Sequence, residues 1–430
     1  MRTGCTAEEG DFSGWRAALL KNDLVSLVAV PDIGGRIMAY DLDGYPFLFV
    51  DRNLAGQLFT PEENMGDGSL ASWKNYGGDK TWPAPQGWDS DDQWHGPPDP
   101  VLDTGRYLLD LLESDGNTAT VRMVSPTGSP TGIMIVRQAT IRAGSSRVHL
   151  DLRFRNVADR PVRWSVWDVV QLRAERLDDN GRLAPDEECV VTAPINPRSR
   201  FLRGFQVMFG DPLNPQWDLD AARGLFVGNY RWQIGKVGLD TRGGWAAFAN
   251  KTAGYAFVAR FPVYPDEEYP DDGADVEFWT VGRGRVANLD YEHTDIYLME
   301  LEVLSPLRHL NPGEETSFRV EWGACRCPGP VVAVAEAGCA GEVLSAVRHG
   351  DRVRLTGAFG VFDRGNLEAV WMDSAGDEVS RTDIGSVSPL SAVLLDRAEL
   401  VPWRAESVEL TVSTSEGRQR LARARLLKQE

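Results

Sequence analysis

Two glutamates in the segment TDIYLMELEVL could carry out acid–base chemistry. Glu300 and Glu302 are two residues apart in a run where they alternate with the apolar residues Met299, Leu301 and Val303. Successive side chains of a β-strand point to opposite faces, so we expect both carboxylates on one face, about 6.5 Å apart along the strand. A carboxylate held in this way can act as a general base. In the alternative interpretation, both glutamates are solvated on a convex face of a sheet.

A second candidate is the stretch NYGGDKTWPAPQGW, residues 75–88, which places Asp79 and Lys80 between two glycines and two tryptophans. We interpret it as a ligand-binding loop, in which aromatic faces receive the apolar side of a ring and the charged pair binds its hydroxyls. In the alternative, the glycines form a turn and the tryptophans fill a core. Core packing accounts for the tryptophans but not for the charged pair, so we favour the ligand-binding interpretation.

The balance of charge limits the classes of partner. With 45 basic and 63 acidic residues, the net charge is −18 and the isoelectric point is near 4.8. Nucleic acids and anionic lipids require a basic face, so neither is expected as a partner. The sequence contains no apolar run of membrane-spanning length, and its first residues lack the apolar core of a signal peptide. These features predict a cytoplasmic protein that does not contact a membrane; the oligomeric state is left open.

Neither a metal nor a cofactor is predicted. The five cysteines are scattered and odd in number, which favours reduced thiols over a disulfide framework. The histidines form no zinc-binding pattern. The acidic segment YPDEEYPDDGADVE could supply oxygen ligands to Ca²⁺, but it lacks the ordered spacing of an EF-hand loop, so we interpret it as a solvated turn.

Alternation with a period of two dominates the chain and predicts an all-β fold. Residues 147–157, RVHLDLRFRNV, show it most clearly, and similar runs recur between segments rich in Gly, Pro, Asn and Asp. Strands without alternating helices favour a large antiparallel sandwich or barrel. A Pro-Gly pair at 328–329 is followed by small residues and new strands, so we place a domain boundary there: residues 1–328, then a small immunoglobulin-like or fibronectin-like β-sandwich at 329–430.

The first domain resembles the galactose mutarotase-like superfamily, which includes the aldose 1-epimerases. Three stretches carry the resemblance: LVSLVAVPDIGGRIMAYDLDG, NYGGDKTWPAPQGW and YLMELEVLSPLRHLNPGEETSFRVEW. The run Gly-Gly-Asp-Lys-Thr-Trp-Pro is similar to a bacterial branch of that superfamily with no settled activity. The resemblance implies a β-supersandwich that binds a saccharide on its concave face, with Glu302 as the base.

The sequence also departs from the epimerases, which use two histidines around the sugar. Tyr76 stands where one would precede the glycine pair, and Trp167 stands where the other would align in WSVWDVVQL. Histidine is the usual acid near neutral pH, so its absence would leave the acid role to Lys80 or Asp168, with Tyr76 as a further donor.

These arguments define a candidate site and three functional hypotheses. The candidate catalytic residues are Glu302, Glu300, Lys80 and Asp168, and the candidate substrate-binding residues are Arg36, Asn75, Tyr76, Asp79, Trp82, Gln86, Trp167, Lys236 and Glu277. The first hypothesis is a sugar epimerase or mutarotase, an isomerase. The second is a carbohydrate-binding protein without catalysis. The third is a uronate lyase, in which Arg36 and Lys80 neutralise the carboxylate beside the carbon that loses its proton.

Overall fold

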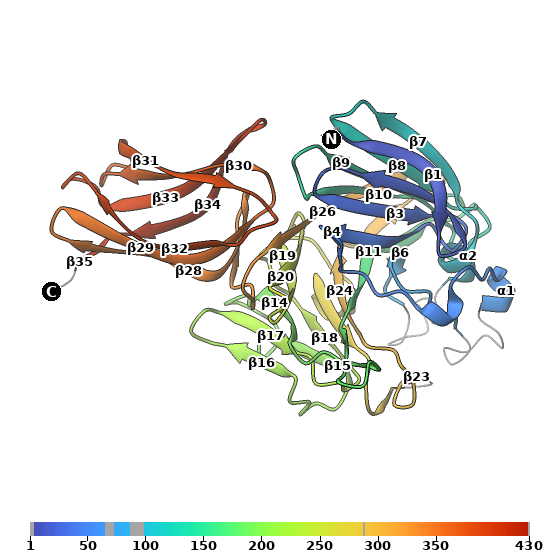
Figure 1. Ribbon diagram of the computed structural model, residues 1–430. Helices are drawn as coiled ribbons and strands as arrows, with labels where there is room; N and C mark the ends of the chain where they lie inside the picture. The colour runs from blue at the N-terminus through green and yellow to red at the C-terminus, as the bar shows by residue number, and fades with distance from the viewer. Residues whose placement is uncertain (1–3, 65–72, 87–98, 287–288, 429–430) are drawn as a thin grey trace. The chain divides into compact units, whose positions relative to one another are not determined.

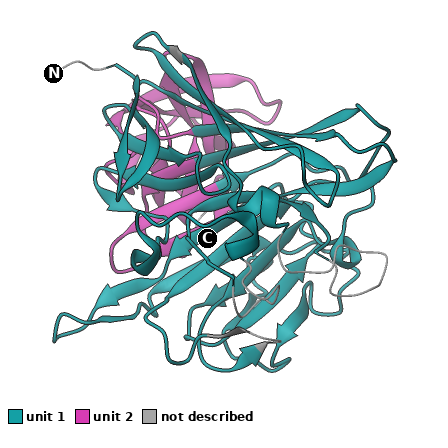
Figure 2. Ribbon diagram, turned by 90° about the vertical axis from the view of Figure 1, so that its right-hand side faces the viewer, with its two compact units in different colours: residues 1–143, 148–246, 259–322 teal, residues 144–147, 247–258, 323–430 magenta. Residues whose placement is uncertain are grey.

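The computed structural model describes residues 4–64, 73–86, 99–286 and 289–428. The chain divides into two compact units, shown in separate colours in Figure 2. Unit 1 comprises residues 1–143, 148–246 and 259–322, and unit 2 comprises residues 144–147, 247–258 and 323–430. Each unit therefore collects more than one segment of the chain, and the single boundary after residue 328 remains a prediction from the sequence.

Unit 1 contains a 12-stranded sheet, and this sheet positions the candidate site (Figure 1). Its central path runs in the order β1 (Thr6–Phe12), β2 (Trp15–Lys21), β3 (Val25–Val30), β4 (Arg36–Leu42), β6 (Asp79–Ala84), β11 (Val162–Arg173), β24 (Leu298–Leu304), β21 (Val276–Thr280), β18 (Gly235–Leu239) and β15 (Gln206–Gly210). Off this path, β5 (Tyr45–Pro46) pairs with β4, and β25 (Arg308–Leu310) pairs with β11.

A second layer of antiparallel strands faces this sheet. One part has the order β26 (Glu315–Arg326), β10 (Val148–Asn156), β9 (Ile133–Arg142), β8 (Thr118–Val124) and β7 (Leu108–Ser114), and another has β16 (Trp217–Asp220), β17 (Leu225–Asn229) and β14 (Cys189–Pro194). Ring contacts join the two layers: Tyr40 lies 5.8 Å from Trp322, and Phe226 stacks on Phe278 at 5.5 Å. The aromatic core therefore lies between the layers.

The remaining elements are short. Two small hairpins pair β12 (Glu175–Leu177) with β13 (Leu183–Pro185), and β22 (Arg285–Val286) with β23 (Leu289–Asp290). The helical turns are η1 (Arg52–Leu54), α1 (Pro61–Asn64), α2 (Pro100–Thr104) and η3 (Asp271–Gly273). In Figure 1, α1 and α2 lie together near β6.

Unit 2 is also built from strands. One sheet has the order β27 (Ala333–Val334), β28 (Gly338–His349), β29 (Arg352–Val361) and β32 (Val393–Leu400), with β35 (Leu427–Lys428) parallel to β28; the other has β31 (Glu378–Val387), β30 (Gly365–Met372), β33 (Ser407–Thr414) and β34 (Gly417–Arg425). Strand β20 (Tyr255–Arg260) and strand β19 (Trp245–Asn250) fall largely in this unit. An apolar cluster that includes Leu355, Trp371 and Leu410 joins residues of both sheets. The predicted all-β class is confirmed.

The quoted stretch is not a loop where its charged pair lies. Asp79–Ala84 forms β6, which pairs with β11 and β4 inside the large sheet, and all six residues are buried. The sequence of β6 shows no alternation of polar and apolar residues, because polar and charged side chains are buried on both faces of this strand. Trp88 lies outside the described residues.

Two aspartates and one arginine are buried between the layers of unit 1. Arg137 of β9 forms an ion pair with Asp79 and donates to its backbone oxygen, and Asp168 of β11 lies beside Asp79. Burial and the neighbouring Asp79 carboxylate raise the pKa of Asp168 well above its usual value. A single arginine thus neutralises one carboxylate, which favours a protonated Asp168 in the folded state.

We expect the contribution of Asp168 to the stability of the folded protein to fall as the pH rises above the ordinary aspartate range, about 4. A raised folded-state pKa means that the native state binds the proton more tightly, so its contribution is present at low pH and is lost as the pH rises. Asp168→Asn should flatten this slope, because the amide mimics the protonated acid. Urea denaturation between pH 4 and 8 measures it, with exposed Asp179→Asn as the control. Equal slopes in wild type and Asp168→Asn would contradict the assignment.

Candidate functional site

Cross-strand register brings distant candidate residues together on one face of the 12-stranded sheet. In one row, Lys80 of β6 lies opposite Val169, which lies opposite Glu302, which lies opposite Glu277. In the next row, Gln171, Glu300, Trp279 and Lys236 follow one another across β11, β24, β21 and β18. Directly opposed residues share a face, so five neighbouring strands contribute to one surface.

The second of these rows lines a pocket with a cavity volume of about 70 Å³. Its walls are mainly aromatic, with a few polar groups between the rings. The lining residues are Trp73, Asn75, Trp82, Gln86, Trp167, Gln171, Phe209, Lys236, Trp279, Val281, Tyr291 and Glu300. Since one water occupies about 30 Å³ of liquid, the pocket holds part of a small molecule rather than a whole oligosaccharide.

Lys80 and Glu300 form the first ionic contact at this pocket. Lys80 Nζ lies 3.3 Å from Glu300 Oε1, and the Gln171 side-chain amide donates to the same oxygen at 2.5 Å. The ammonium also lies over the rings of Trp73, at 5.0 Å, and Trp82, at 4.4 Å. Burial lowers the pKa of Lys80, although the Glu300 carboxylate acts in the opposite direction. Glu300 itself is partly exposed and lines the pocket.

Lys236 forms the second ionic contact, and two carboxyl groups share it. Its Nζ lies 2.7 Å from Glu277 Oε2 and 2.9 Å from Glu302 Oε2, and 4.5 Å from the Trp167 ring centroid. The Trp167 indole N–H donates to Glu302 Oε2 at 2.9 Å. Glu277 and Glu302 are both fully buried and do not line the pocket, so they lie beneath Lys236 rather than beside a ligand.

Burial controls the protonation of Glu277, Glu302 and Lys236. It raises the pKa of Glu302 to about 8 and that of Glu277 to about 7, against the opposing effect of Lys236. Burial alone would lower the pKa of Lys236, but the two carboxyl groups raise it above its ordinary value. One ammonium cannot fully compensate two buried carboxylates. The geometry therefore favours a charged lysine with one proton shared between the two glutamates at neutral pH.

Several predicted site residues lie elsewhere. Asp79 and Asp168 face the interior between the layers, on the opposite face from Lys80 and Trp167. Arg36 is fully buried, forms an ion pair with Asp103, and donates to the Gly77 backbone oxygen at 3.1 Å.

Tyr76 is likewise remote from the pocket lining. It is fully buried in an apolar cluster, with its ring edge-on to Trp15 at 6.0 Å. Asn75, Gln86, Trp82, Trp167, Lys236 and Glu300 do line the pocket. The structure thus brings together part of the predicted set and separates from it the two aspartates, Arg36 and Tyr76.

Six pocket residues were not predicted: Trp73, Gln171, Phe209, Trp279, Val281 and Tyr291. Two of them carried a signal in the sequence, because each stands at an even spacing from a candidate on the same strand and so shares its face. Trp279 follows Glu277 at this spacing on β21, and Gln171 lies four residues after Trp167 on β11. The other four lie outside β11 and β21, so this spacing does not indicate them.

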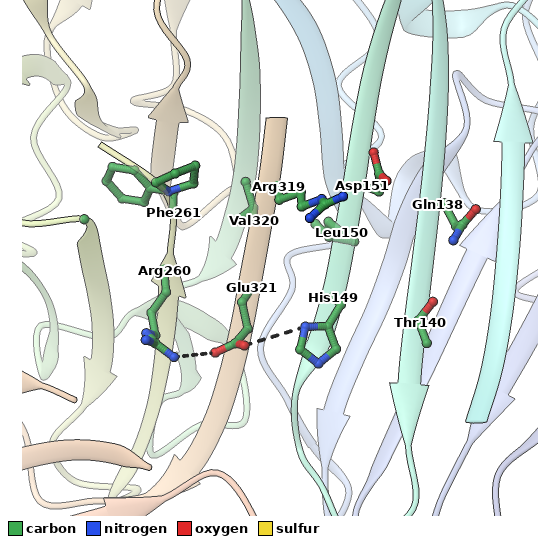
Figure 3. Close-up of a pocket in the computed structure, with 12 residues that line it drawn as sticks. Gln138, Thr140, His149, Leu150, Asp151, Arg260, Phe261, Arg319, Val320 and Glu321 are labelled. Carbon is green, nitrogen blue, oxygen red and sulfur yellow. Dashed lines mark hydrogen bonds and ion pairs between the residues drawn. The ribbon is translucent and has the colours of Figure 1, made fainter. Parts of the chain in front are cut away.

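A larger cavity, about 470 Å³, lies on the second layer of unit 1 (Figure 3). Three of its polar groups pair with one another: Glu321 contacts Arg260 at 2.9 Å and His149 Nδ1 at 3.6 Å. These side chains are partly exposed on a sheet face, and Phe261 is the single aromatic residue in the lining. It offers fewer aromatic faces than the smaller pocket.

Within the described residues, no group of three or more His, Cys, Asp or Glu side chains is placed to hold a metal ion. The acidic segment considered for Ca²⁺ includes Asp275, whose carboxylate accepts the backbone N–H groups of Thr241 and Arg242 at 2.7 and 3.1 Å. A search of the same residues finds no helix with the length and hydrophobicity needed to span a bilayer.

Residues 16–325 match the family model described as "Domain of unknown function (DUF4380)". The chain belongs to the DUF4380 family. Because the match covers unit 1 and its pocket, the site described above lies within the family's own domain. No curated protein matches this DUF4380 member.

Several solved structures are similar to this DUF4380 chain at low identity. A galactose mutarotase-like protein from Clostridium acetobutylicum is 11% identical, with 75% of this chain and 99% of that chain covered and a TM-score of 0.47. A galactose mutarotase-like protein from Lactobacillus casei is 11% identical over 72% and 99%, with a TM-score of 0.42. The Slr1438 protein from Synechocystis is 15% identical over 74% and 99%, with a TM-score of 0.44. Likeness at this level does not assign an activity.

Removing the Lys236 charge should destabilise the protein strongly at neutral pH. Lys236→Met leaves Glu277 and Glu302 buried without a cation, and breaking a buried pair in this way costs about 3 kcal/mol or more. The loss should shrink as the pH falls below about 7, because both carboxyl groups then become neutral. Urea denaturation at pH 5 and 8 measures this, with exposed Lys21→Met as the control. A loss that does not depend on pH would contradict the ionic account.

Proposed function

We propose that the aromatic pocket of unit 1 binds a neutral saccharide through one sugar ring. The observation that carries the proposal is the composition of the pocket: six aromatic side chains surround Lys236, Glu300 and three amide side chains. Aromatic faces suit the apolar C–H faces of a sugar, and amides, carboxylates and ammonium groups bind its hydroxyls.

The pairing of charges favours a neutral ring over a uronate. A uronate carboxylate needs an available cation, but Lys80 is held by Glu300 and Lys236 by two glutamates. Arg36, the other cation considered for this role, is fully buried against Asp103. An added carboxylate would therefore meet the Glu300 carboxylate and no uncommitted cation, which disfavours the lyase hypothesis for this pocket.

A second candidate function is epimerisation or mutarotation of the bound sugar, and one observation favours it. Glu300 lines the pocket, whereas Glu302 is enclosed beneath Lys236. Glu300 would accept the proton of the anomeric hydroxyl, and a second group must donate a proton to the ring oxygen. Lys80 does not itself line the pocket, but its ammonium contacts Glu300, which does. Because burial lowers its pKa, Lys80 suits the donor role better than Lys236, whose ammonium holds its proton tightly.

Calorimetric titration against glucose, galactose and xylose, and against glucuronate and galacturonate, tests the binding proposal. We expect at least one neutral sugar to bind at least tenfold more tightly than its uronate. Trp279→Leu should weaken that binding about fivefold, because it removes one aromatic face worth about 1 kcal/mol. The control is Trp403→Leu, since Trp403 is 89% exposed and lies in unit 2. Tighter binding of the uronates would contradict the proposal.

Optical rotation tests the isomerase candidate. With freshly dissolved α-anomers of the same sugars, the protein should speed the approach to anomeric equilibrium, and Glu300→Gln should slow the catalysed rate on the order of 10²- to 10⁴-fold. The exposed Glu8→Gln serves as the control. A wild-type rate in Glu300→Gln, with loss in Glu302→Gln, would assign the base to Glu302. No catalysed rate in the wild type, together with binding, would leave the non-catalytic function.

A further inference from the structure

A second cavity, about 650 Å³, adjoins the aromatic pocket at the edge of the 12-stranded sheet. It is lined by Gly210, Asp211, Asn214, Gln233, Ile234, Arg283, Gly284 and Arg285. Three segments contribute to both spaces. Phe209 lines the pocket and Gly210 the cavity; Lys236 lines the pocket and Ile234 the cavity.

The third shared segment follows β21. Val281 lines the pocket, and Arg283, two residues later, lines the cavity. The Ile234 backbone N–H donates to the Arg283 backbone oxygen at 2.9 Å, which holds the two cavity-lining segments together. Ile234 also packs in one apolar cluster with the pocket residues Trp279 and Tyr291, so the cavity begins beside the pocket lining.

The cavity differs from the pocket in the ion pairing of one cation, Arg283. Arg283 is exposed and stacks against Trp232, with its guanidinium carbon 5.3 Å from the ring centroid. No carboxylate of the described residues pairs with it. The one acidic side chain in the lining, Asp211, already accepts the Leu213 backbone N–H at 2.9 Å.

We propose that this cavity binds an acidic substituent, a uronate or a sulfated or phosphorylated ring, on the unit that follows the neutral sugar in the pocket. This inference rests on the proposed saccharide function and extends it to acidic oligosaccharides. The Arg283 guanidinium offers a planar pair of donors that fits carboxylate, sulfate and phosphate oxygens. In a chain of net charge −18, an exposed arginine that pairs with no carboxylate of the described residues is a local attraction for an anion.

The test compares two disaccharides that differ by one carboxylate, cellobiose and cellobiouronic acid, together with xylobiose and aldobiouronic acid. In calorimetric titration, we expect the acidic member of a pair to bind at least tenfold more tightly. Arg283→Met should remove that preference and leave the affinity for the neutral member unchanged. The preference should also fall as the salt concentration rises from 50 to 500 mM, because surface charges are screened.

Arg203→Met is the matched control, because Arg203 is also exposed, stacks on Phe205 at 4.6 Å, and is absent from the lining of this cavity. Equal binding of the two members by the wild type, or a preference that survives in Arg283→Met, would overturn the inference and leave the saccharide pocket standing. Failure of both neutral and acidic members to bind would overturn the pocket assignment and the inference with it.

Discussion

Side-chain alternation along five adjacent strands decides which charged groups can reach a ligand. On β6 and β11 it sends Lys80 and Trp167 to the pocket face, and their chain neighbours Asp79 and Asp168 to the interior. The sheet therefore carries ionic groups on both faces. Each face needs its own compensating cations, and these are Arg137 within the sandwich and the two lysines at the pocket. A shift of one residue in register would exchange the two sets.

The two buried ionic clusters have a common chemical feature, since each contains one more carboxyl group than it has cations close by. In the interior, Arg137 is the cation beside Asp79 and Asp168. Beneath the pocket, Lys236 is the cation between Glu277 and Glu302. Each cluster is best accommodated by one retained proton, which reduces the cost of burying charge. At the pocket this arrangement keeps Lys236 charged, as a fixed hydrogen-bond donor, and holds Glu277 and Glu302 away from the ligand. Glu300 is left as the carboxylate that a ligand can touch.

The sequence allowed the shared face of Glu300 and Glu302 to be predicted because period two is a local property of one strand. The same rule would have separated Trp167 from Asp168 and Lys80 from Asp79, because chain neighbours on a strand cannot share a face. Treating residues 75–88 as a loop hid that conclusion. By contrast, the meeting of Glu302 with Lys236 depends on the order of β24, β21 and β18 in the sheet. That order is set by long-range pairing and has no signature in local spacing.

The most direct test of the central claim is the nuclear magnetic resonance spectrum of protein labelled with ¹⁵N at the tryptophan indoles, titrated with glucose, galactose, xylose and cellobiose. Pocket signals are assigned by single Trp→Phe changes. If the pocket binds a sugar, the indole signals of Trp167 and Trp279 should shift in a saturable manner, while those of Trp371 and Trp403 in unit 2 stay fixed. Saturable binding that moves no pocket indole would contradict the account and place the sugar site elsewhere.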